Sequence, residues 1–266
     1  RSSVSTGADF GAKNVTFISG GNIKLTNLAK ATGTGTANYL AQAYGNILVD
    51  GPLTATGGRI NLTLQSDYDG NSDGAIRVTA AITTNGGNIT MGGGSGTITA
   101  GSGYAVGNST YTNGVYIGGT TDAGGGNVVI NGRGANLSSN DNYGISIAAV
   151  LQTAGSGTIT LNGIGGGNTN SGGNHGVTVG RNAVGRVTAV NGQITINGTG
   201  GGAGTGSSNM GVLASGVSGG KVNTTGSGAI VITGTGGTGS GGSNIGVQSN
   251  YTDGINTSGS GSITIY

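Results

Sequence analysis

The sequence contains no cysteine and no tryptophan, and it has a single proline and a single histidine. The absence of cysteine excludes a disulfide framework and any redox or metal site built on thiols. Glutamate is also absent, and lysine, arginine and glutamine are scarce. These residues favour helices, and no stretch spaces its apolar residues by three and four over several turns. We therefore expect almost only strands and loops.

Charge is sparse as well. The chain has 10 basic and 8 acidic residues, a net charge of +2, and no basic cluster. Binding along a phosphate backbone needs a basic patch, so we expect no nucleic-acid partner. No apolar run approaches the ~18 residues of a membrane span, and we expect no transmembrane segment. The chain opens at Arg1 without a signal-type leader, so we expect that a leader was removed or that the chain is a piece of a longer protein.

Glycine is the most abundant residue, with 64 copies in 266 positions. A collagen helix is excluded, because no strict Gly-X-Y triplet runs through the chain and proline is nearly absent. Disorder is disfavoured, because 33% of the residues are hydrophobic and they fall in alternating, β-branched runs. The remaining interpretation is an ordered fold that needs a tight turn every few residues.

A short phrase, glycine followed by an alternating β-branched run, returns regularly from residue 96 onward. The intervals between its glycines are 30, 31, 35, 36 and 33 residues. A period of this size indicates a stack of similar units, each burying its apolar face on the next. The copies are Gly96–Ala100, Gly126–Ile130, Gly157–Leu161, Gly192–Ile196, Gly228–Ile232 and Gly261–Ile265.

The unit that begins at Gly192 contains three short strand-like segments. Gln193–Ile196 alternates, a glycine-rich loop follows, and Asn209–Leu213 and Lys221–Thr224 supply the other two. Three short strands per coil, in register from coil to coil, predict an all-β fold: a parallel β-solenoid of roughly triangular section.

The period also suggests how the chain is organised. We expect residues 1–266 to form a single β-solenoid domain. Residues 1–95 lack the long glycine loops and would form shorter coils, whereas residues 96–266 would form the repeats of 30–36 residues.

Two columns of residues support this register. Each second strand carries an asparagine two residues before its glycine, and asparagines stacked about 4.8 Å apart would hydrogen-bond from coil to coil as a ladder. The alternative is that asparagine is simply common in turns. An inward column of branched residues would form the core. The ladder is Asn142, Asn174, Asn209 and Asn244, and the core column is Ile98, Val128, Ile159, Ile194, Ile230 and Ile263.

Two stretches of the first half carry a family resemblance. They are GRINLTLQSDYDGNSDGAIRV at residues 58–78 and ITTNGGNITMGGG at residues 82–94. They resemble the repeats of filamentous-haemagglutinin-like exoproteins, which are large bacterial surface proteins, and the glycine-loop repeats after residue 96 are similar to the downstream repeats of that group. The resemblance implies a right-handed β-helix, export to the cell surface, and adhesion or matrix roles. It supplies no catalytic residues.

One polar turn has the composition of a calcium loop. Asp67, Asp69, Asn71 and Asp73 place oxygen side chains at alternating positions, and Ca²⁺ takes six to eight oxygen ligands from a flexible turn. Against calcium, Ser72 stands where an EF-hand loop has glycine, and no glutamate follows. The alternative is an ordinary polar turn between two strands.

Tyrosines are the only frequent aromatic residues, and Tyr104, Tyr111 and Tyr116 form the densest group. Exposed tyrosine rings stack on sugar rings, so these three are the candidate glycan contacts. The alternative is that they cap the core or fill a corner of a coil.

Catalytic patterns have little support. Of the 8 acidic residues only Asp67, Asp69 and Asp73 lie together, whereas many β-helix enzymes that cleave polysaccharides use clustered carboxylates. His175 occupies a repeat position that Tyr143 and Met210 fill elsewhere, so we expect it to be a variable surface side chain.

These observations leave three functional hypotheses. The first is a non-enzymatic extracellular adhesin or matrix module at the bacterial cell surface, which contacts a cell-surface glycan or protein. The second is an extracellular fibre subunit that self-associates along the solenoid axis. The third is a polysaccharide-active β-helix enzyme.

Overall fold

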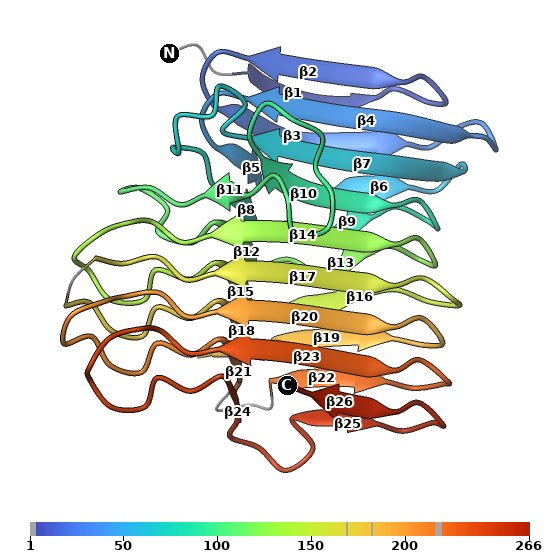
Figure 1. The fold of residues 1–266 in the computed structure, drawn as a ribbon. Helices are drawn as coiled ribbons and strands as arrows, with labels where there is room; N and C mark the ends of the chain where they lie inside the picture. The colour runs from blue at the N-terminus through green and yellow to red at the C-terminus, as the bar shows by residue number, and fades with distance from the viewer. Residues whose placement is uncertain (1–3, 169, 182, 216–219) are drawn as a thin grey trace.

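The computed structural model describes residues 4–168, 170–181, 183–215 and 220–266, which form strands joined by turns and loops. The chain winds as stacked coils from β1 to β26 (Figure 1). Every pairing between named strands in this part of the chain is parallel, and each strand pairs with the equivalent strand of the next coil. The predicted all-β parallel β-solenoid is therefore confirmed. No helix within the described ranges is long and apolar enough to cross a membrane.

One face of the solenoid is a sheet with one strand from each coil. Its order follows the chain, and the short strand β11 pairs with β14 off the main path. The strands are β2 Val15–Ser19, β4 Thr36–Ala43, β7 Arg59–Ser66, β10 Ile89–Gly93, β11 Ala105–Val106, β14 Val128–Arg133, β17 Ile159–Ile164, β20 Ile194–Thr199, β23 Ile230–Thr235 and β26 Ile263–Ile265.

The other two faces belong to one larger sheet, which divides into two columns at β3 (Ile23–Lys30). The first half of β3 pairs with β5 and its second half with β6, so β3 turns the corner between the columns, and β1 (Val4–Asp9) pairs beside it. The first column continues as β5 Ile47–Val49, β8 Ile76–Val78, β12 Val115–Ile117, β15 Ile145–Ile147, β18 Val177–Val179, β21 Val212–Ala214 and β24 Val247–Ser249. The second continues as β6 Leu53–Ala55, β9 Ile82–Thr83, β13 Thr121–Asp122, β16 Val150–Gln152, β19 Arg186–Ala189, β22 Lys221–Thr224 and β25 Ile255–Thr257.

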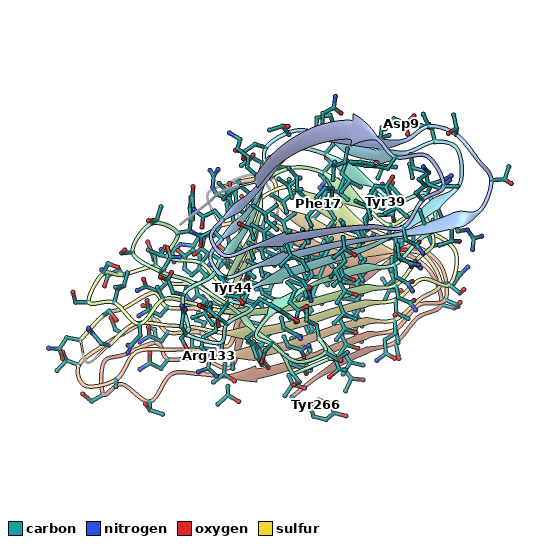
Figure 2. The ribbon with its side chains drawn as sticks, turned by 90° about the horizontal axis from the view of Figure 1, so that it is seen from above. Asp9, Phe17, Tyr39, Tyr44, Arg133 and Tyr266 are labelled. Atoms are coloured by element: carbon teal, nitrogen blue, oxygen red, sulfur yellow. The ribbon has the colours of Figure 1, made fainter. Side chains whose placement is uncertain are left out.

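A single apolar core runs inside the coils. Side chains alternate along each strand, so every second residue points inward and stacks on its equivalent in the next coil. Val128, Ile159, Ile194 and Ile230 pair in sequence and are fully buried, as predicted. Around the first coils, the rings of Phe10 and Phe17 lie 5.8 Å apart and those of Phe10 and Tyr39 lie 6.1 Å apart, at the end of the core (Figure 2).

The expected core position of Ile98 is wrong. Ile89 pairs with Val128 and occupies that place in the column, fully buried. Ile98 lies in a loop outside the sheet, where Thr99 and Ser102 form an antiparallel bridge. The segment Gly96–Ala100 therefore matches the sequence pattern of the repeat but does not form a strand of the sheet. Ile263 does pair with Ile230 but is 41% exposed, because β26 has a paired neighbour on one side only.

The repeated positions require glycine because the backbones of neighbouring coils lie close together there. A Cβ placed on Gly192 would overlap the carbonyl oxygen of Gly157 in the preceding coil, although Gly192 has an ordinary backbone conformation. The same overlap with a carbonyl of the preceding coil recurs along the column, whereas Gly96 faces open space. Backbone proximity, and not a left-handed turn, thus explains the periodic glycine. This glycine column consists of Gly87, Gly126, Gly157, Gly192, Gly228 and Gly261.

We predict that Gly192→Ala destabilises the protein by about 1–3 kcal/mol or more, because backbone atoms of two coils must separate to admit the methyl group. Gly96→Ala is the matched control, and its effect should stay within about 1 kcal/mol, since the added methyl group meets nothing. Urea and thermal unfolding of both variants measure the difference. Equal stabilities would contradict the close-contact explanation.

Candidate functional site

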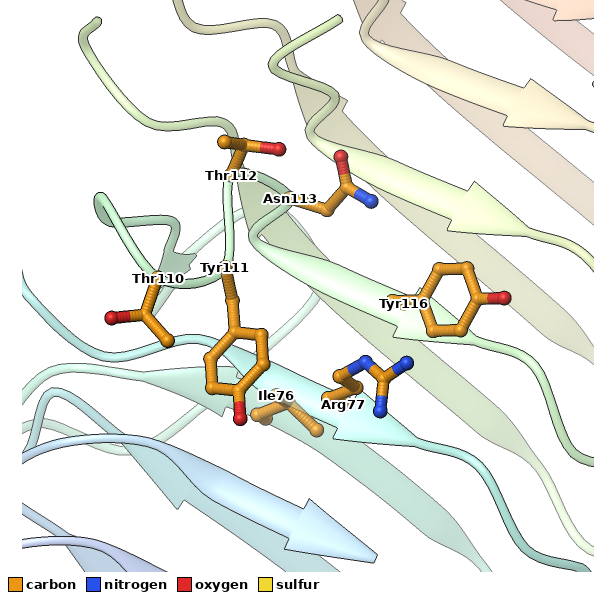
Figure 3. A pocket seen from close by; sticks show the side chains of 7 residues that line it. All are labelled: Ile76, Arg77, Thr110, Tyr111, Thr112, Asn113 and Tyr116. Atoms are coloured by element: carbon orange, nitrogen blue, oxygen red, sulfur yellow. The ribbon is translucent and has the colours of Figure 1, made fainter.

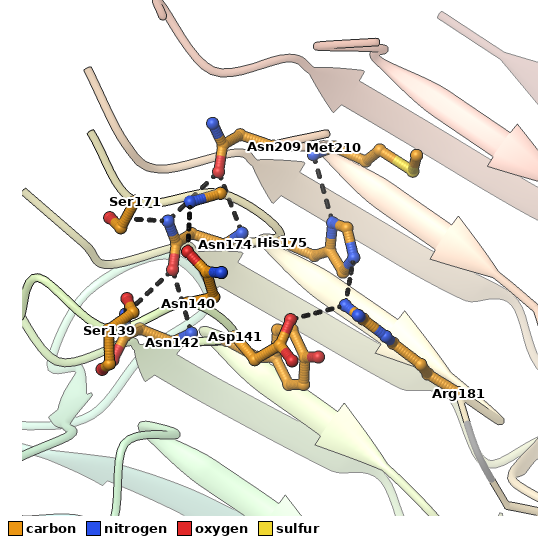
Figure 4. A network of polar contacts seen from close by, with 12 residues as sticks. Ser139, Asn140, Asp141, Asn142, Ser171, Asn174, His175, Arg181, Asn209 and Met210 are labelled. Atoms are coloured by element: carbon orange, nitrogen blue, oxygen red, sulfur yellow. Dashed lines mark hydrogen bonds and ion pairs between the residues drawn. The ribbon is translucent and has the colours of Figure 1, made fainter. Parts of the chain in front are cut away.

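The four asparagines of the predicted ladder lie on successive coils, before the strands of the first column, and Figure 4 shows Asn142, Asn174 and Asn209. The backbone N–H and the Nδ2 of Asn142 donate to Oδ1 of Asn174, at 3.0 and 2.9 Å. Asn174 repeats both bonds to Asn209, at 2.9 and 3.1 Å. The N–H of Asn209 donates to Oδ1 of Asn244 at 2.9 Å. Asn142, Asn174 and Asn209 are fully buried, so the ladder supplies hydrogen bonds where water has no access.

A second asparagine ladder, which the sequence analysis missed, precedes the strands of the first sheet. In it a side-chain oxygen accepts an N–H from the next coil, at 2.8 Å from Asn38 to Asn14 and 3.0 Å from Asn88 to Asn61. The signal was visible, since an asparagine precedes several of the alternating runs. Successive partners are 24, 23, 27, 39 and 31 residues apart, so the first coils are the short ones. The partners are Asn14, Asn38, Asn61, Asn88, Asn127 and Thr158.

The structure does not gather the calcium candidates into one ligand set. Asp67 is buried, and its Oδ1 accepts the N–H of Asp73 at 3.2 Å across the turn. The amide of Asn71 donates to Asp69 at 2.8 Å. Burial, followed by the nearby charge of Asp69, raises the pKa of Asp67 despite hydrogen bonds from the turn. Within the described ranges, no three or more His, Cys, Asp or Glu side chains are arranged to hold a metal ion.

Asp73 instead anchors a neighbouring loop through Asn108. The Nδ2 of Asn108 donates to Asp73 at 2.8 Å and to Asn46 at 2.7 Å. Its Oδ1 accepts the backbone N–H groups of Thr110 and Tyr111, at 3.0 and 2.9 Å. These bonds hold the loop that carries Tyr111 against the polar turn.

Two of the three candidate tyrosines share a pocket. Tyr116 on β12 pairs with Arg77 on β8, and both side chains face outward, with the ring of Tyr111 on the other side of Arg77 from Tyr116 (Figure 3). The Arg77 guanidinium carbon lies 5.4 Å from the ring centroid of Tyr116 and 5.9 Å from that of Tyr111. All three side chains are half-buried, and the pocket has a volume of about 320 Å³. Ile76, Thr110, Thr112 and Asn113 complete its wall.

Tyr104 lies apart from this pair. It lines a separate pocket with Arg133, whose guanidinium carbon is 5.9 Å from the ring centroid. Burial raises the pKa of Tyr104, and the charge of Arg133 opposes the shift. The sequence cluster of three tyrosines therefore divides into two sites, each with its own arginine.

The prediction that His175 is a surface side chain is wrong. It is only 2% exposed, and its ring stacks on Tyr143 with 5.3 Å between centroids and 4° between planes. Its Nδ1 accepts the N–H of Met210 at 3.2 Å, and Arg181 lies 2.9 Å from its Nε2. Arg181 also pairs with Asp141 at 2.9 Å (Figure 4). No sequence pattern indicates this arrangement, because the ion pair links residues from different coils.

Burial and the charge of Arg181 lower the pKa of His175 to about 4, although Asp141 opposes them. Burial, partly opposed by Arg181, raises the pKa of Tyr143. Both rings are therefore neutral at pH 7. The buried ring pair joins two coils, and the Arg181–Asp141 ion pair beside it is partly exposed.

No protein-family model, curated protein or solved structure matches the chain.

We predict that Asn174→Ala lowers the free energy of unfolding by about 1–3 kcal/mol, because it leaves the buried N–H of Asn142 without an acceptor. Asn136→Ala, at an exposed position, is the control and should change stability by less than about 0.5 kcal/mol. Chemical denaturation tests both. A cost for Asn174→Ala no greater than that of the control would show that the ladder contributes nothing.

A pH dependence follows from His175. Between about pH 6.5 and 4 the unfolded chain binds a proton that the folded chain excludes, so stability falls as the pH drops and levels off below about 4. The free energy of unfolding falls by about 3 kcal/mol at most through this titration. His175→Met, which introduces the residue found at this position one coil later, should remove that part of the slope while the aspartates still titrate. Unfolding curves at pH 4 to 8 measure this, and identical slopes would refute it.

Proposed function

We propose that the chain is a non-enzymatic module of an extracellular adhesin or matrix protein of the filamentous-haemagglutinin-like kind, which contacts glycans from the bacterial cell surface. The observation that carries the proposal is the Tyr111–Arg77–Tyr116 pocket, two aromatic rings held around a cation on an outward face of a solenoid. Rings of this kind stack on sugars.

The surroundings of the pocket support binding rather than chemistry. The nearest charged pair, Lys24 and Asp50, is joined at 3.1 Å, and Asp50 also accepts the Thr79 hydroxyl at 3.0 Å. Although partial burial opposes them, these contacts and the charges of Lys24 and Arg77 lower the pKa of Asp50. A carboxylate held ionised in this way is a poor general acid.

The remainder of the molecule supports a structural scaffold. Consecutive coils are joined by strand pairing, by both asparagine ladders and by the glycine column. Such a stack holds surface groups at fixed spacing, as a repetitive adhesive surface requires.

We predict that the chain binds glycans or host cells, and that Tyr111→Ala with Tyr116→Ala weakens this binding at least about tenfold, since each stacked ring contributes up to ~1.5 kcal/mol beyond its buried area. Tyr251→Ala is the control, because Tyr251 is exposed in a different pocket. Glycan arrays and cell-binding assays measure the effect. New reducing ends or unsaturated products from bacterial, plant or algal polysaccharides would replace the proposal with an enzymatic one.

A further inference from the structure

We propose that the pocket between β8 and β12 binds the carboxylate of an acidic sugar, such as a uronic or sialic acid residue within a glycan. Arg77 would bind the carboxylate, and the rings of Tyr111 and Tyr116 would contact the sugar. This inference rests on the proposed glycan-binding function and names the class of sugar.

The first step of the argument is the state of Arg77. Within the described residues its guanidinium makes no ion pair or hydrogen bond. The rings of Tyr116 and Tyr111 lie beside it, and its charge acts on Asp50 without a direct contact. A guanidinium carries five N–H donors in a planar fork that matches a carboxylate. The two rings lie 5.4 and 5.9 Å from the guanidinium carbon, and the N–H donors have no acceptor among the described residues. The side chain is thus ordered and half-buried yet retains its capacity to bind an anion.

The second step is the local charge. Lys24 and Asp50 neutralise each other at 3.1 Å, and Asp73 accepts from Asn108 behind the Tyr111 loop, so Arg77 is the charged residue that lines the pocket itself. A sulfated polymer needs several cations side by side, and the basic residues of this chain are scattered. One positive charge fits one carboxylate.

The third step favours a sugar over an acidic peptide. The pocket offers two flat rings, the hydroxyls of Thr110 and Thr112, and the amide of Asn113. The Oδ1 of Asn113 already accepts the N–H of Tyr143 at 3.2 Å, which fixes the amide and leaves its NH₂ as a donor. Rings and fixed donors suit the faces and hydroxyls of a pyranose. The pocket volume of about 320 Å³ is at the small end for ligand sites, as one or two sugar residues require.

Preorganisation is the fourth step. Asn108 joins the loop of Tyr111 to Asn46 and Asp73, as described above, and Gly74 and Val106 exchange backbone hydrogen bonds at 3.0 and 2.9 Å. Arg77 and Tyr116 sit on paired strands, whose separation is set by the solenoid. The side chains and the loop of the pocket are already ordered, so binding costs little conformational entropy. A low entropic cost favours affinity in a small site.

The test compares matched saccharides by calorimetry on the whole chain. The probes are trigalacturonate and its methyl ester, and sialyllactose and lactose. We expect each carboxylated probe to bind about tenfold or more tightly than its neutral partner, and Arg77→Gln to abolish that difference. Arg77→Lys should restore part of it, because the charge remains and the planar fork is lost. Arg133→Gln, beside Tyr104 in the other pocket, should leave it unchanged.

Several outcomes overturn the inference. They are equal binding of ester and acid, loss of discrimination in Arg133→Gln instead of Arg77→Gln, or tighter binding of a heparin fragment or a hexaglutamate peptide. If the chain still binds cells or neutral glycans, the adhesive function stands and only the acidic-sugar site falls. If it binds neither cells nor any glycan, both proposals fall. Circular dichroism and the thermal midpoint of each variant separate lost binding from lost folding.

Discussion

Parallel backbone pairing between consecutive coils is the constraint on which this structure depends. Each strand takes its hydrogen bonds from the equivalent strand one coil away, at a spacing of about 4.8 Å. Any residue therefore lies directly against its counterpart in the next coil, as Thr160 lies against Thr195 and Thr195 against Val231. The residue at each strand position must therefore fit the equivalent residues of the coils on both sides.

Three recurrent features follow from that stacking. Branched apolar residues pack inward because Ile159, Ile194 and Ile230 must fill the same place in successive layers. Buried turns carry asparagine because its amide both accepts from and donates to neighbouring coils. Glycine occurs where two backbones approach too closely for a Cβ, as at Gly192. The high glycine content is thus a consequence of coil-to-coil contact as well as of turns.

The candidate binding pocket lies where the chain departs from the regular repeat. The loop that carries Tyr111 interrupts the regular coil, and it is fixed by Asn108 to the turn that ends at Asp73. Asp73, one of the calcium candidates of the sequence, accepts the hydrogen bond from Asn108 that holds this loop. In contrast, His175 stands at a position that is also buried in the neighbouring coils, where Tyr143 and Met210 occupy it, and it contacts Tyr143 and Arg181 there. The irregular loop therefore builds a surface pocket, whereas the regular position of His175 builds an internal contact between coils.

The sequence by itself determined the solenoid, its three strands per coil and the core column from Val128 to Ile230, because period and alternation are local properties that survive without coordinates. It could not separate the true coil at Ile89 from its imitation at Ile98, since both read as glycine followed by an alternating run.

Only the tertiary structure decided which side chains from different coils meet. Arg77 and Tyr116 lie far apart along the chain and touch because β8 and β12 pair, while the neighbours Tyr104 and Tyr111 line separate pockets. The burial of His175 was decided in the same way. The physical reason is that contact across coils depends on the length of every intervening loop, which composition and periodicity do not fix.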